Sequence, residues 1–166
     1  NETLALLDCV RRAFNPGALP PGLEPGMSLA AHFKPDHPTF PNGCHICHLE
    51  IDAQTGAVEI RRYTAVNDVG RLLNRTLVEG QFHGGLAQGI GQALLEEMIY
   101  EADSGQILSG SLMDYCYPKA DDFVDFDLDF IEIPCLSNPL GVKGCGEAGT
   151  IAAPPTIANA VMDALA

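Results

Sequence analysis

The sequence predicts an α+β fold, and three observations carry this prediction. Two strand-like segments flank a short polar turn, a long glycine-rich helical pattern follows, and a third strand-like segment precedes a last helical pattern. Strands and helices are therefore mixed without the regular β-α-β alternation of doubly wound folds. With 166 residues, of which 46% are hydrophobic and 19% charged, the chain has the composition of a globular protein with one core.

The first half of the chain predicts a helix, a connector and a β-hairpin. Apolar residues recur at helical spacing in residues 3–14, which are expected to form the end of a helix. Residues 15–43 are expected to form a connector, because proline and glycine keep such a segment extended. Residues 44–51 and 57–66 are predicted to be strands, and the polar turn at 52–56 predicts that they pair as a hairpin.

The second half predicts a long helix, a strand and a final helix. Either Asn74 or Thr76 is expected to cap the long helix, whose apolar residues continue to Met98. Residues 126–133 alternate between apolar and acidic side chains, which predicts a half-buried strand. The last helix is expected over 157–165, after a glycine loop and a pair of prolines.

Composition and charge exclude several classes of protein. The net charge of −13, with acid concentrated in residues 121–129, argues against nucleic acid as a partner, because nucleic acid binding needs a basic face. No apolar run approaches the roughly 20 residues of a membrane span, so no membrane association is expected. The six cysteines are expected to be free thiols of a cytoplasmic protein. The first residue is not Met, and we expect the chain to be a piece of something longer or a processed product.

The segment from Gly141 to Glu147 is the most informative part of the chain. Glu147 is a lone carboxylate among glycines and small apolar residues. Little hydration is expected there, so its pKa should rise toward the range of a general base. The alternative is a glycine turn whose glutamate sits at the start of a helix, where the helix dipole favours it. Spacing alone leaves both interpretations open.

A second glycine-rich run, residues 79–92, lies within the predicted long helix. It holds five glycines, and each costs about 1 kcal/mol relative to alanine inside a helix. Close approach of a ligand, or of another helix, would explain them. The interleaved glutamines suit the edge of a heterocycle or a phosphate. The run matches neither the dinucleotide fingerprint nor the phosphate-binding P-loop, which excludes those two classes.

The sequence Cys44-His-Ile-Cys47-His48 matches the C-x-x-C-H pattern of haem attachment and could also be half of a zinc site. Strand alternation opposes both, because it places Cys44 and His48 on one face and Cys47 on the other. An ordinary strand is the favoured interpretation. His83 has no histidine one turn further on, and Cys145 has no local histidine base, so both are interpreted as structural.

Several motifs occur together in one order, and they resemble the molybdenum-binding large subunit of the molybdenum hydroxylases. This family includes xanthine dehydrogenase, aldehyde oxidases and aerobic carbon monoxide dehydrogenase. The resemblance covers nearly the whole chain and points to the C-terminal end of the molybdopterin-binding domain. The motifs are FPNGCH (40–45), VNDVGRLLN (66–74), VEGQFHGGLAQGIGQ (78–92), GSLMDY (110–115) and NPLGVKGCGEAG (138–149).

The resemblance implies specific roles for eight residues. Glu147 matches the catalytic base, which activates the molybdenum-bound hydroxyl group during oxidative hydroxylation with water as oxygen source. Gln81 matches the glutamine that hydrogen-bonds the pterin. The remaining residues are expected to lie at the cofactor, and none of them is expected to ligate the metal: Gln88, Gly89, Lys143, Gly144, Cys145 and Gly146. Cys145 departs from the aliphatic residue that many members carry, and Cys44 and Cys47 are also unusual.

The resemblance also implies a cofactor and partners. The cofactor would be molybdopterin cytosine dinucleotide with molybdenum, and the substrate a small aldehyde, N-heterocycle or related molecule. The partners would be the remainder of the large subunit, an iron–sulfur small subunit with 2Fe-2S clusters and a flavin-containing medium subunit with FAD. Residues 1–166 are thus interpreted as a C-terminal fragment, inactive alone. The competing hypotheses are a non-catalytic structural fragment and a haem-binding electron-transfer module through Cys44, Cys47 and His48.

Overall fold

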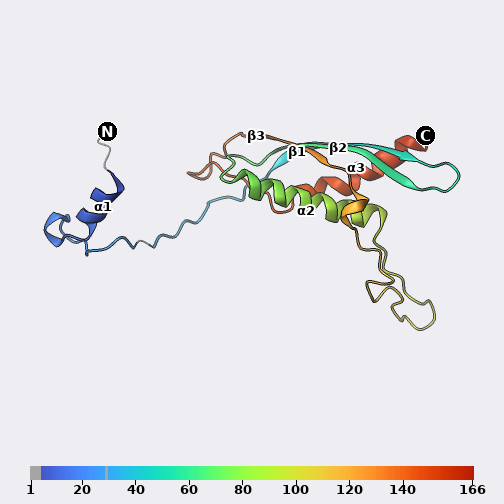
Figure 1. Ribbon diagram of the computed structural model, residues 1–166, viewed down its shortest axis with the longest axis horizontal. Helices are drawn as coiled ribbons and strands as arrows, with labels where there is room; N and C mark the ends of the chain where they lie inside the picture. The colour runs from blue at the N-terminus through green and yellow to red at the C-terminus, as the bar shows by residue number, and fades with distance from the viewer. Residues whose placement is uncertain (1–4, 29) are drawn as a thin grey trace. The chain divides into compact units, whose positions relative to one another are not determined.

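The computed structural model describes residues 5–28 and 30–166 of the chain. The chain divides into two compact units, of which the smaller ends at Lys34 and the larger begins at Pro35. Within the larger unit, a three-stranded sheet and two long helices form the α+β fold that the sequence predicts (Figure 1). None of the helices among the described residues is long and apolar enough to cross a membrane.

The smaller unit contains one short α-helix. This helix, α1 (Leu6–Ala13), buries none of its residues and is followed by a single 3₁₀ turn (Pro16–Ala18). The helix predicted over 3–14 is confirmed where the structure describes it, while Thr3 and Leu4 lie outside the described residues. Beyond the 3₁₀ turn, the described residues form neither helix nor strand until Asn42.

The predicted hairpin is present at the start of the larger unit. Strands β1 (Asn42–Ile51) and β2 (Val58–Asp68) pair antiparallel, and β3 (Phe126–Ile131) adds to β2 in parallel, which gives the order β1-β2-β3. The turn between β1 and β2 is closed by the Asp52 carboxylate, which accepts the N–H of Gln54 at 2.7 Å. β3 ends two residues before the predicted limit.

Helix α2 (Arg75–Leu94) begins where the sequence allowed two alternatives. Asn74 is the cap, because its side chain accepts the Leu77 N–H at 3.1 Å. The prediction that the helix reaches Met98 is wrong. Both Leu95 and Glu96 donate their N–H groups to the carbonyl of Gly91, at 2.9 Å each, so the regular ladder of helical hydrogen bonds ends there.

Helix α3 (Ala148–Ala164) begins nine residues before the predicted start at residue 157. The prediction is wrong because Pro154 and Pro155, interpreted as a boundary, lie inside the helix. Proline removes an N–H and crowds the preceding turn. The neighbouring helix makes room for Pro154 at Gly89, where a Cβ would lie 3.0 Å from Pro154 Cδ.

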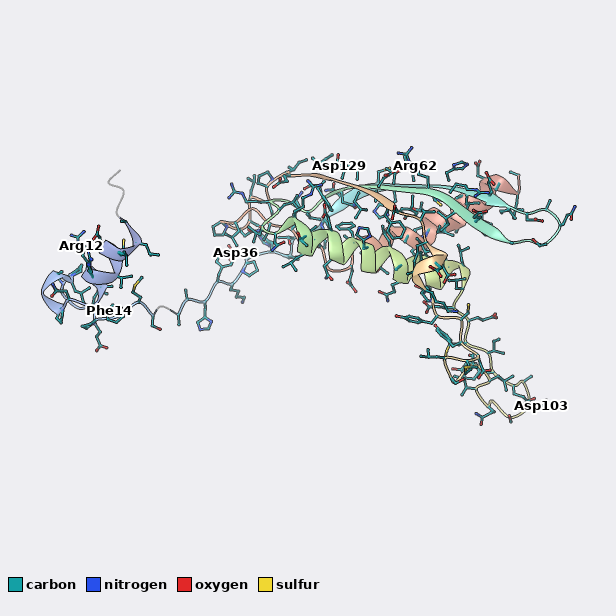
Figure 2. All side chains as sticks on the ribbon, in the orientation of Figure 1. Arg12, Phe14, Asp36, Arg62, Asp103 and Asp129 are labelled. Atoms are coloured by element: carbon teal, nitrogen blue, oxygen red, sulfur yellow. The ribbon has the colours of Figure 1, made fainter. Side chains whose placement is uncertain are left out.

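One hydrophobic core lies between the sheet and the two helices. Figure 1 shows α2 and α3 on the same side of the sheet. The buried side chains of the core come from β2, α2 and α3: Ile60, Tyr63, Ala65, Leu86, Ile90, Ala153 and Ile157. The opposite face of the sheet is polar. Arg62 and Asp129, labelled in Figure 2, lie on that side, and Arg62 pairs with Asp127 at 2.6 Å.

The two helices approach closely through small residues. A Cβ on Gly89 would lie 2.6 Å from the Ala153 Cβ, and one on Gly85 would lie 2.9 Å from the Thr150 backbone nitrogen. Helix packing therefore explains these two glycines of the 79–92 run. It does not explain Gly80 and Gly84, around which a Cβ would meet nothing within 4 Å.

Candidate functional site

Glu147 lies at the N-cap position of α3, directly after the glycine loop. Its side chain is exposed and accepts no hydrogen bond from the described residues. The expectation of little hydration around this carboxylate is therefore wrong within this chain, because glycine and alanine neighbours are too small to cover a side chain that points outward. A second surface would be required to bury it.

A buried ion pair anchors the loop that leads to Glu147. The Lys143 ammonium pairs with the Asp68 carboxylate, and the exposed fractions of the two side chains are only 12% and 4%. The same carboxylate accepts the N–H groups of Gly70 at 2.9 Å and Ile133 at 3.2 Å. Burial acts to raise the pKa of Asp68, yet its ammonium and N–H partners outweigh burial and hold that pKa below its ordinary value. Lys143 thus faces inward and positions the loop.

Backbone contacts fix the loop at a second point. The carbonyl of Gly141 accepts the N–H groups of Arg71 at 2.9 Å and Cys135 at 3.0 Å. Gly70, at φ +69°, permits this approach, since a Cβ there would lie 2.3 Å from the Gly141 oxygen. The Asn138 side chain then closes the turn through two hydrogen bonds with the backbone of Val142. The loop is therefore a rigid support up to Lys143.

The start of α2 meets the end of this loop. A Cβ on Gly146 would have Gln81 Nε2 as its nearest neighbour, at 3.8 Å, while a Cβ on Gly144 would meet nothing within 4 Å. Gln81, Gly144, Gly146 and Glu147 are all exposed, and Figure 1 shows the start of α2 and the loop before α3 at the same end of the unit. Two segments about 65 residues apart thus form one open polar surface.

Three glutamines of α2, which we call the glutamine row, continue this surface: Gln81, Gln88 and Gln92. All three are exposed, and the Gln88 side chain approaches the Thr150 hydroxyl of α3 at 3.4 Å. The far end of the row lines a cavity of about 370 Å³, together with Glu96, Met98 and Tyr115. There the Tyr115 hydroxyl donates to the Glu96 carboxylate at 2.5 Å, and this hydrogen bond raises the tyrosine pKa.

The structure brings together some of the residues predicted for the site and separates others. Gln81 and the loop residues Gly144, Gly146 and Glu147 share the open surface, with Gln88 beside it. Gly89 is buried against α3, and Cys145 is partly buried with its carbonyl accepting the Ala148 N–H at 3.4 Å. Sequence reasoning missed Asp68, whose only signal was its place in the VNDVGRLLN motif, and it missed Glu96 and Tyr115.

The Cys44–His48 segment lies within β1, as the alternation predicts. Cys44, Ile46 and His48 are exposed, whereas His45, Cys47 and Leu49 face the helices, and burial raises the pKa of the Cys47 thiol. The two cysteines of the haem pattern therefore lie on opposite faces of the sheet. Across residues 5–28 and 30–166, no three histidine, cysteine or acidic side chains are grouped as a metal site.

The sequence of the chain matches a known protein family. Residues 3–124 match the model of the molybdopterin cofactor-binding domain, and the chain belongs to this family of molybdenum hydroxylase large subunits. The glycine loop and Glu147 lie beyond the matched range. The resemblance identified from the motifs is therefore confirmed at the level of the family.

Relatives and solved structures agree with this assignment. The chain is 40% identical over 146 residues to the nicotine 6-hydroxylase large subunit of Paenarthrobacter nicotinovorans, covering 88% of this chain and 18% of that one. It is 36% identical to the carbon monoxide dehydrogenase large chain of Afipia carboxidovorans, covering 89% and 18%. Among solved structures, quinoline 2-oxidoreductase from Pseudomonas putida 86 superimposes with a TM-score of 0.85 at 41% identity, over 93% of this chain and 20% of that one. The chain therefore spans about a fifth of the length of these relatives.

Proposed function

We propose that this chain supplies the part of a molybdenum hydroxylase that holds the pterin end of the cofactor and presents Glu147 as the catalytic base. The observation that carries the proposal is the approach of Gln81 to Gly146, which places an amide beside the loop that ends in Glu147. When bound, molybdopterin would supply the molybdenum centre for oxidation of an aldehyde, N-heterocycle or related substrate, with water as oxygen source.

The residues of the open surface fit such a cofactor. Gly144 and Gly146 leave the backbone accessible, so a flat ring system can approach it closely. The exposed amide of Gln81 offers both a donor and an acceptor to the edge of a pterin. We assign direct contacts to Gln81, Gly144, Cys145 and Gly146. Lys143 would act through the loop it anchors, since its ammonium is committed to Asp68.

The glutamine row favours the dinucleotide form of the cofactor. Gln81 and Gln92 are eleven residues apart on one helix, which corresponds to roughly 16 Å at 1.5 Å per residue. A pterin alone would occupy only one end of such a row. A molybdopterin cytosine dinucleotide could extend past Gln88 to the cavity that Gln92 lines. Gly89 would not contact the cofactor, but it would support this surface by allowing α3 to pack close to α2.

Glu147 would act as the base once the rest of a large subunit covers it. Its exposure in this chain leaves the carboxylate free of internal partners, so no hydrogen bond must break before it accepts a proton. Covering the surface would exclude water from the carboxylate and leave it to accept a proton from the reacting group. We therefore propose that the isolated chain is an inactive fragment. The active assembly would include the remainder of the large subunit, a 2Fe-2S small subunit and an FAD medium subunit in the cytoplasm.

Molybdenum and nucleotide content of the complete assembly test this proposal. We expect molybdenum and acid-released cytidine monophosphate in the wild type, and a several-fold lower content of both in Gln81→Ala, because the pterin loses its amide partner. The matched control is Gln54→Ala, which removes an exposed glutamine from the β1–β2 turn and should leave both contents unchanged. Equal loading of the Gln81→Ala and wild-type assemblies would refute the assignment of the pterin site.

A further inference from the structure

A second, smaller cavity lies beside the first turn of α3. Its volume is about 170 Å³, and it lies between the beginning of β1, the end of β2 and the first turn of α3. The walls are mostly apolar, and the polar side chains that line it are Asn42, His45 and Asn67. The residues that matter here are Pro41, His45, Asn67, Ala148, Ile151 and Ala152.

A chain of hydrogen bonds sets the orientation of the polar side chains. The Tyr63 hydroxyl lies 3.0 Å from His45 Nδ1, and His45 Nε2 lies 3.2 Å from Asn67 Oδ1. Burial raises the pKa of Tyr63 to about 12, so its hydroxyl keeps its proton and donates to Nδ1. Burial also lowers the pKa of His45, which favours the neutral ring with its proton on Nε2. That proton is donated to the Asn67 oxygen.

This arrangement leaves the other half of the Asn67 amide unused. Asn67 is only 4% exposed, and its Nδ2 has no hydrogen-bond partner among the described residues. Leaving such a buried donor unpaired costs about 1–3 kcal/mol. The backbone is adapted to keep Asn67 there: a Cβ on Gly43 would lie 2.2 Å from Asn67 Oδ1. The unpaired Nδ2 is thus available to an acceptor from outside the chain.

The surroundings limit the kind of acceptor. The side chain of Asn42, which also lines the cavity, adds an amide with both donor and acceptor capacity. The net charge of −13 and the neighbouring Glu147 disfavour an anion. The apolar walls favour a ligand with a compact apolar ring. The cavity volume equals that of roughly five to six water molecules at about 30 Å³ each. A neutral molecule of about one ring, with a carbonyl oxygen, meets these conditions.

We propose that this cavity binds a small neutral amide or lactam, whose carbonyl oxygen accepts a hydrogen bond from Asn67 Nδ2. The ring of the ligand would lie against Ala148, Ile151 and Ala152. The site is separate from the surface formed by Gln81 and Gly146, and its occupation does not require the cofactor. Binding at this site is therefore additional to the proposed function and can be tested independently of it.

Titration with 2-pyridone, followed by ligand-observed NMR, tests the proposal on the full chain. We expect saturable binding that Asn67→Ala weakens about tenfold or more, which corresponds to the loss of one hydrogen bond to a buried donor. Asn159→Ala, an exposed asparagine on α3, is the matched control and should bind as the wild type does. Benzene, which has no acceptor, should bind weakly and be insensitive to Asn67→Ala.

A second variant keeps the test decisive if Asn67→Ala fails to fold. Ala152→Leu fills the cavity while retaining the donor, and it should also weaken 2-pyridone binding at least tenfold. Repeating the titration on the complete large subunit decides whether the site is open to a free ligand. Binding there supports the proposal. Loss of binding in the complete subunit, or binding unaffected by both variants, overturns it.

Discussion

The two ends of the glycine loop, only four residues apart, have opposite environments. Lys143 is largely covered and committed to Asp68, whereas Glu147 is exposed and free of partners within the described chain. The first end is tied to the sheet through an ion pair and several backbone hydrogen bonds. The loop is therefore fixed where it leaves the sheet and left open where chemistry is proposed. Substitutions at the two ends should therefore affect different properties.

Substitution of Glu147 should give the largest effect, and it should appear in turnover. In the complete assembly, we expect Glu147→Gln to lower kcat by about 10²–10⁴-fold, the usual contribution of a general base. Molybdenum content should remain at the wild-type level. The free energy of unfolding of the chain should change by less than about 0.5 kcal/mol, because the side chain is exposed. Steady-state kinetics, metal analysis and denaturant unfolding provide the three measurements.

Glu97→Gln is the matched control for this prediction. Glu97 is also exposed, and it lies just beyond α2, away from the loop. The control should retain wild-type turnover. Wild-type turnover in Glu147→Gln would show that the exposed end of the loop does not supply the catalytic base.

Substitution of Lys143 should appear in stability. Lys143→Met leaves the buried Asp68 carboxylate without its counter-ion, which typically costs about 3–5 kcal/mol. We expect a lower urea midpoint with an unchanged slope. The matched control is Arg62→Met, which breaks the exposed pair with Asp127 and should cost no more than about 1 kcal/mol. Equal losses of unfolding free energy in the two variants would show that the buried ion pair stabilises the fold no more than the exposed one does.

The pH dependence of stability should give the smallest effect. Folding lowers the pKa of Asp68, so the folded state binds this proton less tightly than the unfolded chain does. The contribution of the ion pair is therefore present above the unfolded value of about 3.9, and it is lost as the pH falls through the lower folded value. The range from about pH 5 to about pH 2 roughly spans this window. Over this range, urea unfolding should show that the free energy of unfolding falls less steeply with decreasing pH in Asp68→Asn than in the wild type.

Much of the fold could be predicted because its signals are local. The hairpin follows from two strand patterns around a turn, and the position of α2 follows from Asn74 and the apolar spacing behind it. The ends of the elements were less predictable. α3 starts early because Gly89 of another helix accommodates Pro154, a contact that no local pattern can reveal.

The candidate site could be predicted only through the family resemblance. Local spacing singled out the glycine loop, yet nothing in it indicated that Gln81 would lie next to Gly146. The anchor of the loop is likewise a long-range feature, since Lys143 and Asp68 are 75 residues apart. The same reason explains the wrong expectation about Glu147: whether a carboxylate is covered depends on surfaces distant in sequence, and about four fifths of the length of the relatives lies outside this chain.

The proline pair inside α3 has a mechanical consequence. Pro154 and Pro155 have no N–H, so the carbonyls of Thr150 and Ile151 receive no hydrogen bond from the following turn. The turn that begins at Glu147 is thus joined to the body of the helix by fewer hydrogen bonds than any turn of α2. The position of the proposed base therefore depends on contacts with α2, where the Thr150 hydroxyl donates to the Gly85 carbonyl at 3.0 Å, as well as on the hydrogen bonds of its own helix.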